Sequence, residues 1–137
     1  MILEYKLEAN REEYGTRGTP LVMGLGAAID FINAIGVRRI QERGMKMASS
    51  LKQELLKIPN VDILTPLEPK YSAAIVTFEV KGKKYGEVQQ LLQDEHKCRV
   101  RGIFEHGLNA VRVSCALYNT HEELEKLVHG VNQIARS

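Results

Sequence analysis

The sequence has no tryptophan, only two cysteines and few aromatic side chains, which make up 6% of its 137 residues. Few aromatics leave little surface on which the bases of single-stranded nucleic acid could stack. The formal net charge is only +2, and lysines and arginines are dispersed among acidic residues instead of forming a basic patch. The chain also lacks a long apolar run and the basic-then-apolar start of a signal peptide. We therefore expect a cytoplasmic protein that binds neither nucleic acid nor membrane.

The two cysteines, Cys98 and Cys115, do not have the close spacing of metal ligands. In a chain without a secretory context they are expected to be reduced thiols. The composition is that of an ordinary globular protein, with 44% apolar and 26% charged residues. A chain of this length can bury a core without disulfides or a structural metal, so no metal site is expected.

The hydrophobic periodicity predicts four helices and four strands. Thr19-Pro20 is a start signal for the first helix and Gly36 a plausible end, and the apolar stripe of that helix should pack against the second one. The helices are expected at residues 20–35, 37–57, 85–95 and 120–135, and the strands at 61–64, 73–80, 98–101 and 110–114. This order predicts an α+β two-layer sandwich, with helices on one face of a mostly antiparallel four-stranded sheet.

One arginine stands among strand-forming residues. Val111 and Val113 flank Arg112, so a strand would bury the valines and direct the guanidinium to a cleft or to solvent. A planar guanidinium that is always charged suits a carboxylate. Downstream, Thr120 and Glu123 have the spacing of a capping box, which predicts a helix start near Thr120.

The segment before the first helix is a second candidate site. Gly15 and Thr16 lie a few residues ahead of Thr19-Pro20. A helix N-terminus with free backbone N–H groups can bind an anion. The same residue types also serve in helix capping alone, and both interpretations are open from the residues themselves.

These segments together resemble one protein family. They are the Gly15-Thr16 segment, the Gly-Leu-Gly-Ala-Ala helix that starts at Gly24, Val100-Arg101-Gly102, and Arg112-Val113-Ser114 followed by Tyr118-Asn119-Thr120. The chain is similar to the C-terminal small domain of the class V pyridoxal-phosphate-dependent aminotransferases. That family includes cysteine desulfurases, selenocysteine lyases and isopenicillin N epimerase-like proteins, and the resemblance implies the small-domain fold of fold-type I enzymes.

The resemblance also implies roles for individual residues. Arg112 would hold the α-carboxylate of an amino-acid substrate, and Arg101 would be a second substrate-binding arginine. Gly15 and Thr16 would reach the phosphate of pyridoxal 5'-phosphate across a homodimer. Residues 1–18 would join a large cofactor-binding domain that this chain lacks, and residues 19–137 would form the small domain.

The chemistry of pyridoxal phosphate needs a Schiff-base lysine, a carboxylate on the pyridinium nitrogen and a ring-stacking residue. In the resembling family the large domain supplies all three, and no lysine here stands in the matching context. We therefore expect no catalytic residue in this chain, which should be inert alone and bind no cofactor. Desulfurases place their sulfur-accepting cysteine in the loop that corresponds to residues 102–109, which has none here. An epimerase-like or lyase-like member is favoured, while transamination, elimination and epimerisation all stay open.

Two alternatives belong to other functional classes. Arg101 and Arg112 could hold a carboxylate in a stand-alone α+β binding module, such as an amino-acid-sensing domain. The chain could also be a plain dimerisation domain.

Overall fold

The structure is a computed structural model, and it describes residues 18–137. They belong to two compact units that meet between Val37 and Arg38. The predictions for residues 1–17, which include Gly15 and Thr16, lie outside the described residues.

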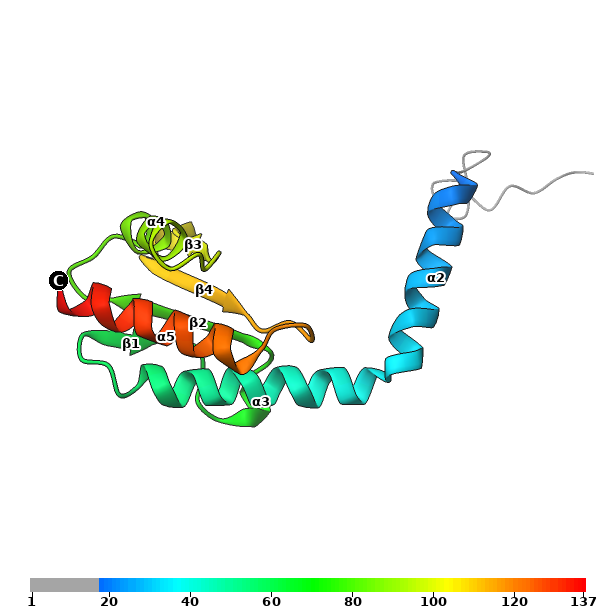
Figure 1. Cartoon of the computed structure of the whole chain (residues 1–137), viewed down its shortest axis with the longest axis horizontal. Helices are drawn as coiled ribbons and strands as arrows, with labels where there is room; N and C mark the ends of the chain where they lie inside the picture. The colour runs from blue at the N-terminus through cyan, green and yellow to red at the C-terminus, as the bar shows by residue number, and fades with distance from the viewer. Residues whose placement is uncertain (1–17) are drawn as a thin grey trace, which may run out of the picture. The chain divides into compact units, whose positions relative to one another are not determined.

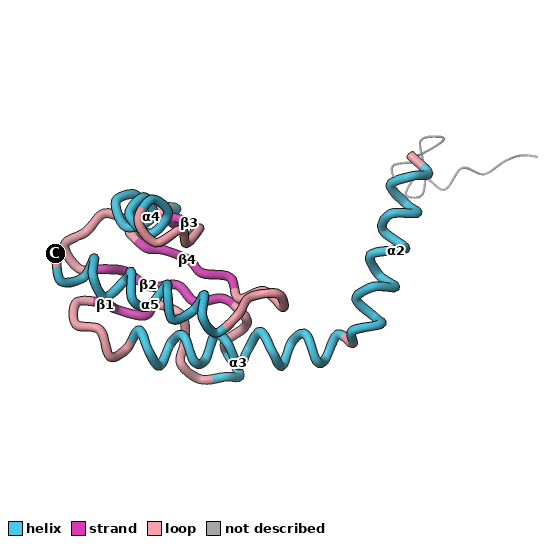
Figure 2. The backbone as a smooth tube through the Cα atoms, in the orientation of Figure 1, coloured by secondary structure: helices cyan, strands magenta, loops and turns pink. Residues whose placement is uncertain are grey.

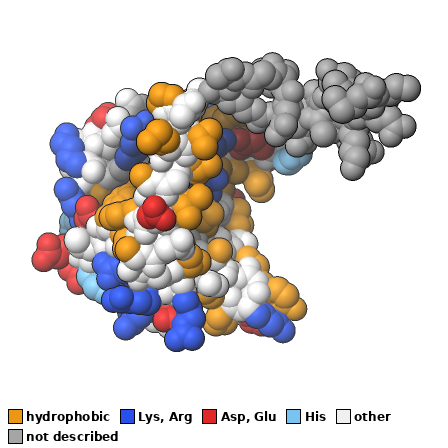
Figure 3. Space-filling model, turned by 90° about the vertical axis from the view of Figure 1, so that its right-hand side faces the viewer, with side chains coloured by type: hydrophobic (Ala, Val, Ile, Leu, Met, Phe, Trp, Pro, Cys, Tyr) orange, Lys and Arg blue, Asp and Glu red, His pale blue; other side chains and the backbone are white. Residues whose placement is uncertain are grey.

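The first unit contains helix α2, Thr19–Ile35 (Figure 1). Proline occupies its first turn, and the helix ends where Gly36 has a φ of 98°, a conformation that glycine adopts freely. These bounds confirm the predicted helix. Within this unit no residue of Thr19–Ile35 is buried, and Leu21 is 80% exposed. Figure 3 shows hydrophobic side chains at the surface of one face of the molecule, interspersed with charged ones.

The second unit carries the remaining elements (Figure 2). They are α3 (Val37–Leu55, which begins at the last residue of the first unit), β1 (Val61–Ile63), η1 (Pro69–Tyr71), β2 (Ile75–Val80), α4 (Tyr85–Asp94), β3 (Arg101–Ile103), η2 (Glu105–Gly107), β4 (Ala110–Ser114) and α5 (His121–Arg136). In residues 18–137, no single helix is long and apolar enough to cross a membrane, and only α2 and α3 taken together reach that length and apolarity.

The four strands form one sheet in the order β1-β2-β4-β3, and every pairing is antiparallel. Val76 pairs with Val113 and Phe78 with Val111, so these four side chains share one face. The same register places the side chains of intervening residues on the other face. The position of Arg112 is therefore fixed by the burial of its neighbours.

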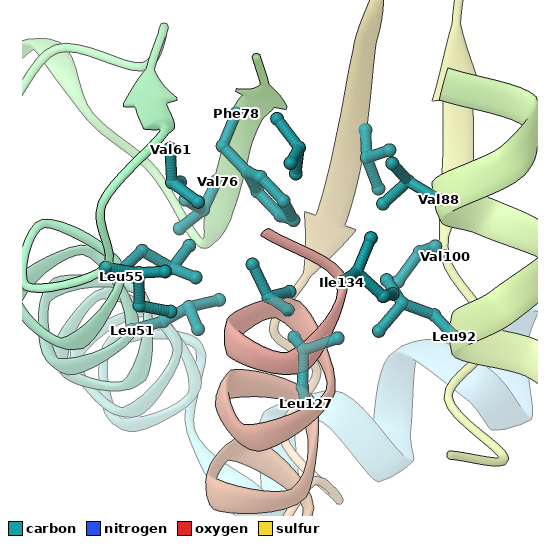
Figure 4. Close-up of a cluster of buried hydrophobic side chains, with 14 of the residues drawn as sticks. Leu51, Leu55, Val61, Val76, Phe78, Val88, Leu92, Val100, Leu127 and Ile134 are labelled. Carbon is teal, nitrogen blue, oxygen red and sulfur yellow. The ribbon is translucent and has the colours of Figure 1, made fainter. Parts of the chain in front are cut away.

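Helices α3, α4 and α5 cover the face that carries Val76 and Phe78. Figure 4 shows their side chains pointing toward those of the strands. The buried cluster includes Leu51 and Leu55 of α3, Val88 and Leu92 of α4, and Leu127, Val131 and Ile134 of α5. This layering confirms the predicted α+β sandwich, and burial of such side chains contributes roughly 1.5–3 kcal/mol each.

The third strand, β3, begins later in the chain than the apolar residues before it predicted. Residues 98–101 were predicted, whereas β3 spans Arg101–Ile103. The strand approaches α4 closely at Gly102, where a Cβ would overlap the ring of Tyr85. The Gly102 N–H donates to Gln89 Oε1 at 2.8 Å. Glycine thus allows the contact between strand and helix, and a glycine is a weak signal for a strand.

A buried lysine fixes the loop between β1 and β2. Lys52 of α3 is only 4% exposed. Its Nζ donates to Ser72 Oγ at 2.8 Å and to the carbonyls of Pro66 and Leu67 at 2.9 and 3.4 Å. These acceptors use the hydrogen-bonding capacity of the ammonium group. The charge is therefore solvated by the protein and ties η1 to α3.

We predict that Lys52→Met lowers the free energy of unfolding by roughly 2–3 kcal/mol, because it removes bonds from a charged donor and leaves their acceptors unpaired. Urea unfolding followed by circular dichroism measures this. Lys46→Met is the matched control, since Lys46 lies on the same helix and is exposed. Equal stability of the two variants would show that the buried ammonium is not needed to hold the loop.

Candidate functional site

The face of the sheet opposite α3, α4 and α5, the helix-free face, carries two arginines side by side. Arg112 in β4 pairs with Arg101 in β3 on one side and with Thr77 in β2 on the other. Side chains that are directly opposite in an antiparallel pair have Cβ atoms about 5 Å apart. The structure thus brings together the two arginines that the sequence analysis singled out.

Arg112 has hydrogen-bonding capacity that the chain does not use. The Arg112 side chain is partly buried, whereas the side chain of its neighbour Val111, on the other face, is almost completely buried. Its Nε is buried and has no hydrogen-bond partner among the residues that the structure describes. An unpaired buried donor costs about 1–3 kcal/mol, more when it belongs to a charged group. An anion that accepted a bond from this atom would remove that cost.

Arg101 has a partner within its own loop. Its Nη2 lies 2.8 Å from Oε1 of Glu105, and both side chains are substantially exposed. Glu105 Oε2 also accepts a bond from the Phe104 N–H at 3.1 Å. Bonds from backbone N–H groups, followed by the bond from Arg101, lower the pKa of Glu105 from its usual value. The carboxylate is therefore charged at neutral pH.

The loop between β3 and β4 is anchored at its far end to α4. Asn109 Oδ1 accepts from the Tyr85 N–H at 2.7 Å, and Asn109 Nδ2 donates to the Lys83 carbonyl at 2.8 Å. The ring of Phe104 stacks on Tyr85, with 5.6 Å between the ring centroids. The asparagine thus satisfies an N–H of the first turn of α4, and the loop is held at both ends.

The turn after β4 is held by its own side chains. Asn119 Oδ1 accepts from the Ala116 N–H at 2.8 Å, and Asn119 Nδ2 donates to Glu123 Oε2 at 3.0 Å. Thr120 and Glu123 form the predicted capping box. The bond from Asn119, followed by the one from the Thr120 N–H, lowers the pKa of Glu123.

Arg43 of α3 joins this turn to its helix. Arg43 Nε donates to the Leu117 carbonyl and Arg43 Nη2 to the Asn119 carbonyl, both at 2.9 Å. Next to it, Gly44 lies so close to Ala74 that a Cβ would approach the Ala74 Cβ to 2.8 Å. The end of β4 is thereby fixed against α3.

The two thiols lie outside the arginine face. Cys98 and Cys115 line a hollow of about 420 Å³ beside Tyr118. Burial raises the pKa of both thiols, so they are mainly protonated at neutral pH and poor nucleophiles. A larger groove of about 660 Å³ runs between α3 and α5, and neither Arg101 nor Arg112 lines it. Among residues 18–137, no cluster of potential metal ligands occurs.

Both arginines could be identified from the sequence, but the groups around them could not. No role could be assigned to Glu105 from the sequence, although its spacing of four residues from Arg101 was a signal that the two could meet. Thr77 could not be found without the register that places it opposite Arg112. The proposed phosphate contacts, Gly15 and Thr16, fall among the residues that are not described.

Comparison with known proteins relates the chain to one family. Residues 3–127 match the family model Aminotransferase class-V. A cysteine desulfurase of Salmonella agona is 28% identical over 134 residues, which are 92% of this chain and 32% of the relative. A protein of Methanothermobacter thermautotrophicus named "Probable cysteine desulfurase" is 30% identical over 135 residues, 90% of this chain and 33% of the relative. The chain thus spans about a third of the length of the curated relatives it matches.

Solved structures have the same fold. The apo cysteine desulfurase of Thermococcus onnurineus NA1 superposes with a TM-score of 0.82 at 28% identity, over 90% of this chain and 33% of that one. A complex of the cystine C-S lyase C-DES with cysteine persulfide gives a TM-score of 0.73 at 22% identity, over 88% of this chain and 31% of that one. The latter likeness shows the fold alone.

The lowered pKa of Glu123 predicts how stability depends on pH. Its folded pKa lies below the unfolded one, so its contribution is complete above the unfolded value, about 4.3, and is lost as pH falls through the folded value. Glu123→Gln should therefore reduce the loss of stability between about pH 5 and 3. Thermal unfolding at a series of pH values measures this. Glu122→Gln, one residue earlier in the same helix, should keep the wild-type profile, and a wild-type profile for Glu123→Gln as well would contradict the assignment.

Proposed function

Since the chain belongs to the class-V aminotransferase family, we propose that it is the carboxylate-binding C-terminal part of a pyridoxal-phosphate-dependent enzyme that acts on an amino acid. Arg112 holds the α-carboxylate of the substrate. The observation that carries this proposal is the buried Nε of Arg112, a donor without a partner in the described chain, on the helix-free face of the sheet. The two oxygens of a carboxylate can accept two parallel hydrogen bonds from one guanidinium group.

The cofactor itself does not fit this face. The family uses pyridoxal phosphate, which needs a lysine for its aldehyde and a group to stack on its ring. Among the strand residues that the structure describes, none on the helix-free face is a lysine or an aromatic residue. What these residues can do is hold an anion and fix its orientation. We assign the cofactor chemistry to a large domain that works together with this chain.

The missing parts of the site follow from the same proposal. Gly15 and Thr16 contact the cofactor phosphate across a homodimer, as the sequence resemblance implies. The helix-free face then lies against the large domain, and the enzyme is cytoplasmic. Alone, the chain is catalytically inert.

The reaction class is proposed from the loop between β3 and β4. The curated relatives are named as cysteine desulfurases, yet residues 102–109 contain no cysteine. The two thiols that the chain does have are kept protonated by burial. These observations favour a lyase or epimerase over an enzyme that transfers sulfur through a loop cysteine.

In the complete enzyme, Arg112→Lys should raise the substrate KM by roughly ten- to a hundredfold, because lysine keeps the charge but lacks the planar pair of donors. Steady-state kinetics measures this. Arg39→Lys, at an exposed position of α3, is the matched control. Unchanged KM and kcat in Arg112→Lys would assign Arg112 to structure alone.

The isolated chain should stay colourless after incubation with pyridoxal phosphate and removal of the excess. The reason is that none of its lysines has the sequence context of the lysine that forms the Schiff base with the cofactor. Absorbance spectra, with borohydride trapping and mass spectrometry, measure this. A stoichiometric adduct at one specific lysine would contradict the assignment of the cofactor chemistry to another domain.

A further inference from the structure

The two arginines of the helix-free face repel each other. Arg101 and Arg112 are register partners in adjacent strands, and like charges directly opposite each other destabilise a sheet. Among the described strand residues, the other charged groups on this face are Asp62 and Glu79, which are register partners in β1 and β2. Asp62 is in turn bound by Lys81 at 2.9 Å. Among the described residues, neither carboxylate forms an ion pair with Arg101 or Arg112, so neither balances the two arginines directly.

Glu105 supplies a counter-charge from the loop. The chain reverses there through two residues in the left-handed region, His106 with a φ of 57° and Gly107 with a φ of 77°. Before this reversal, Glu105 bonds to Arg101 Nη2 through one oxygen and to the Phe104 N–H through the other. The backbone bond fixes the carboxylate, so that it points to Arg101 without help from a ligand.

The consequence is an unequal pair of arginines. The charge of Arg101 is balanced by an internal carboxylate, while Arg112 keeps a buried donor without a partner in the described residues. The net charge of the three groups is that of one arginine. A ligand with one carboxylate balances it, whereas a second carboxylate on the ligand would have to displace Glu105.

We propose that Glu105 is a specificity-determining residue, an internal counter-ion that reserves Arg101 and selects amino acids with a single carboxylate. This inference rests on the proposed function, because it takes Arg112 as the anchor for the α-carboxylate. Glu105 acts through Arg101 and is a positioning residue.

The test compares two probes on the full chain, propionate with one carboxylate and succinate with two. Labelled with ¹⁵N, the chain gives arginine Nε–H signals whose shifts report binding at neutral pH and constant ionic strength. In the wild type both probes should shift the Arg112 signal with similar dissociation constants. In Glu105→Gln, succinate should gain about fivefold over propionate, a factor typical of one exposed ion pair.

Two further variants make the comparison specific. Glu68→Gln removes the same charge from another surface ion pair, that with Lys70, and should keep the wild-type ratio. Arg101→Gln combined with Glu105→Gln should abolish the gain. Circular dichroism confirms that each variant is folded.

The outcomes separate the two proposals. If propionate shifts Arg112 in the wild type but Glu105→Gln leaves the succinate-to-propionate ratio unchanged, the role of Glu105 is overturned and the carboxylate site stands. If neither probe shifts Arg112 in any variant, the proposed function falls and this inference falls with it.

Discussion

Burial of one face of the sheet is the constraint on which the rest of the structure depends. Val76, Phe78 and Val111 must lie under the helices, because together with leucines of α3 and α4 they form the core. Strand geometry then places Thr77 and Arg112 on the opposite face. A shift of β4 by one residue would bury the guanidinium and expose Val111, so the hydrophobic core also specifies the position of the proposed carboxylate anchor.

The turns that flank β4 keep this position fixed. On one side, Asn109 ties the loop to the start of α4. On the other, Asn119 and the capping box hold the turn into α5, and Arg43 binds it to α3. A binding group must be held within a fraction of an ångström to act on a small anion. Asn109, Asn119 and Arg43 have no recognisable role in the sequence, but in the structure they support the site by holding the turns around β4.

Much of this could be predicted from the sequence, because the signals were local. The period-2 pattern around Arg112 gave β4 its bounds of Ala110–Ser114, and the spacing of Thr120 and Glu123 identified the start of α5. Non-local features could not be predicted. The pairing of Arg101 with Arg112 depends on strand order, which no local pattern specifies. The start of β3 was predicted too early, because Gly102 lies in the strand but has no side chain that could mark it in an apolar pattern.

The central claim is that Arg112 binds the α-carboxylate of an amino acid on the helix-free face. A crystal structure of the complete enzyme with a bound amino-acid substrate analogue tests it most directly. We predict two hydrogen bonds of about 2.7–2.9 Å from the Arg112 guanidinium, one of them from Nε, to the two oxygens of the α-carboxylate. A carboxylate held by other groups, with Arg112 directed to solvent or bonded only within the protein, would contradict it.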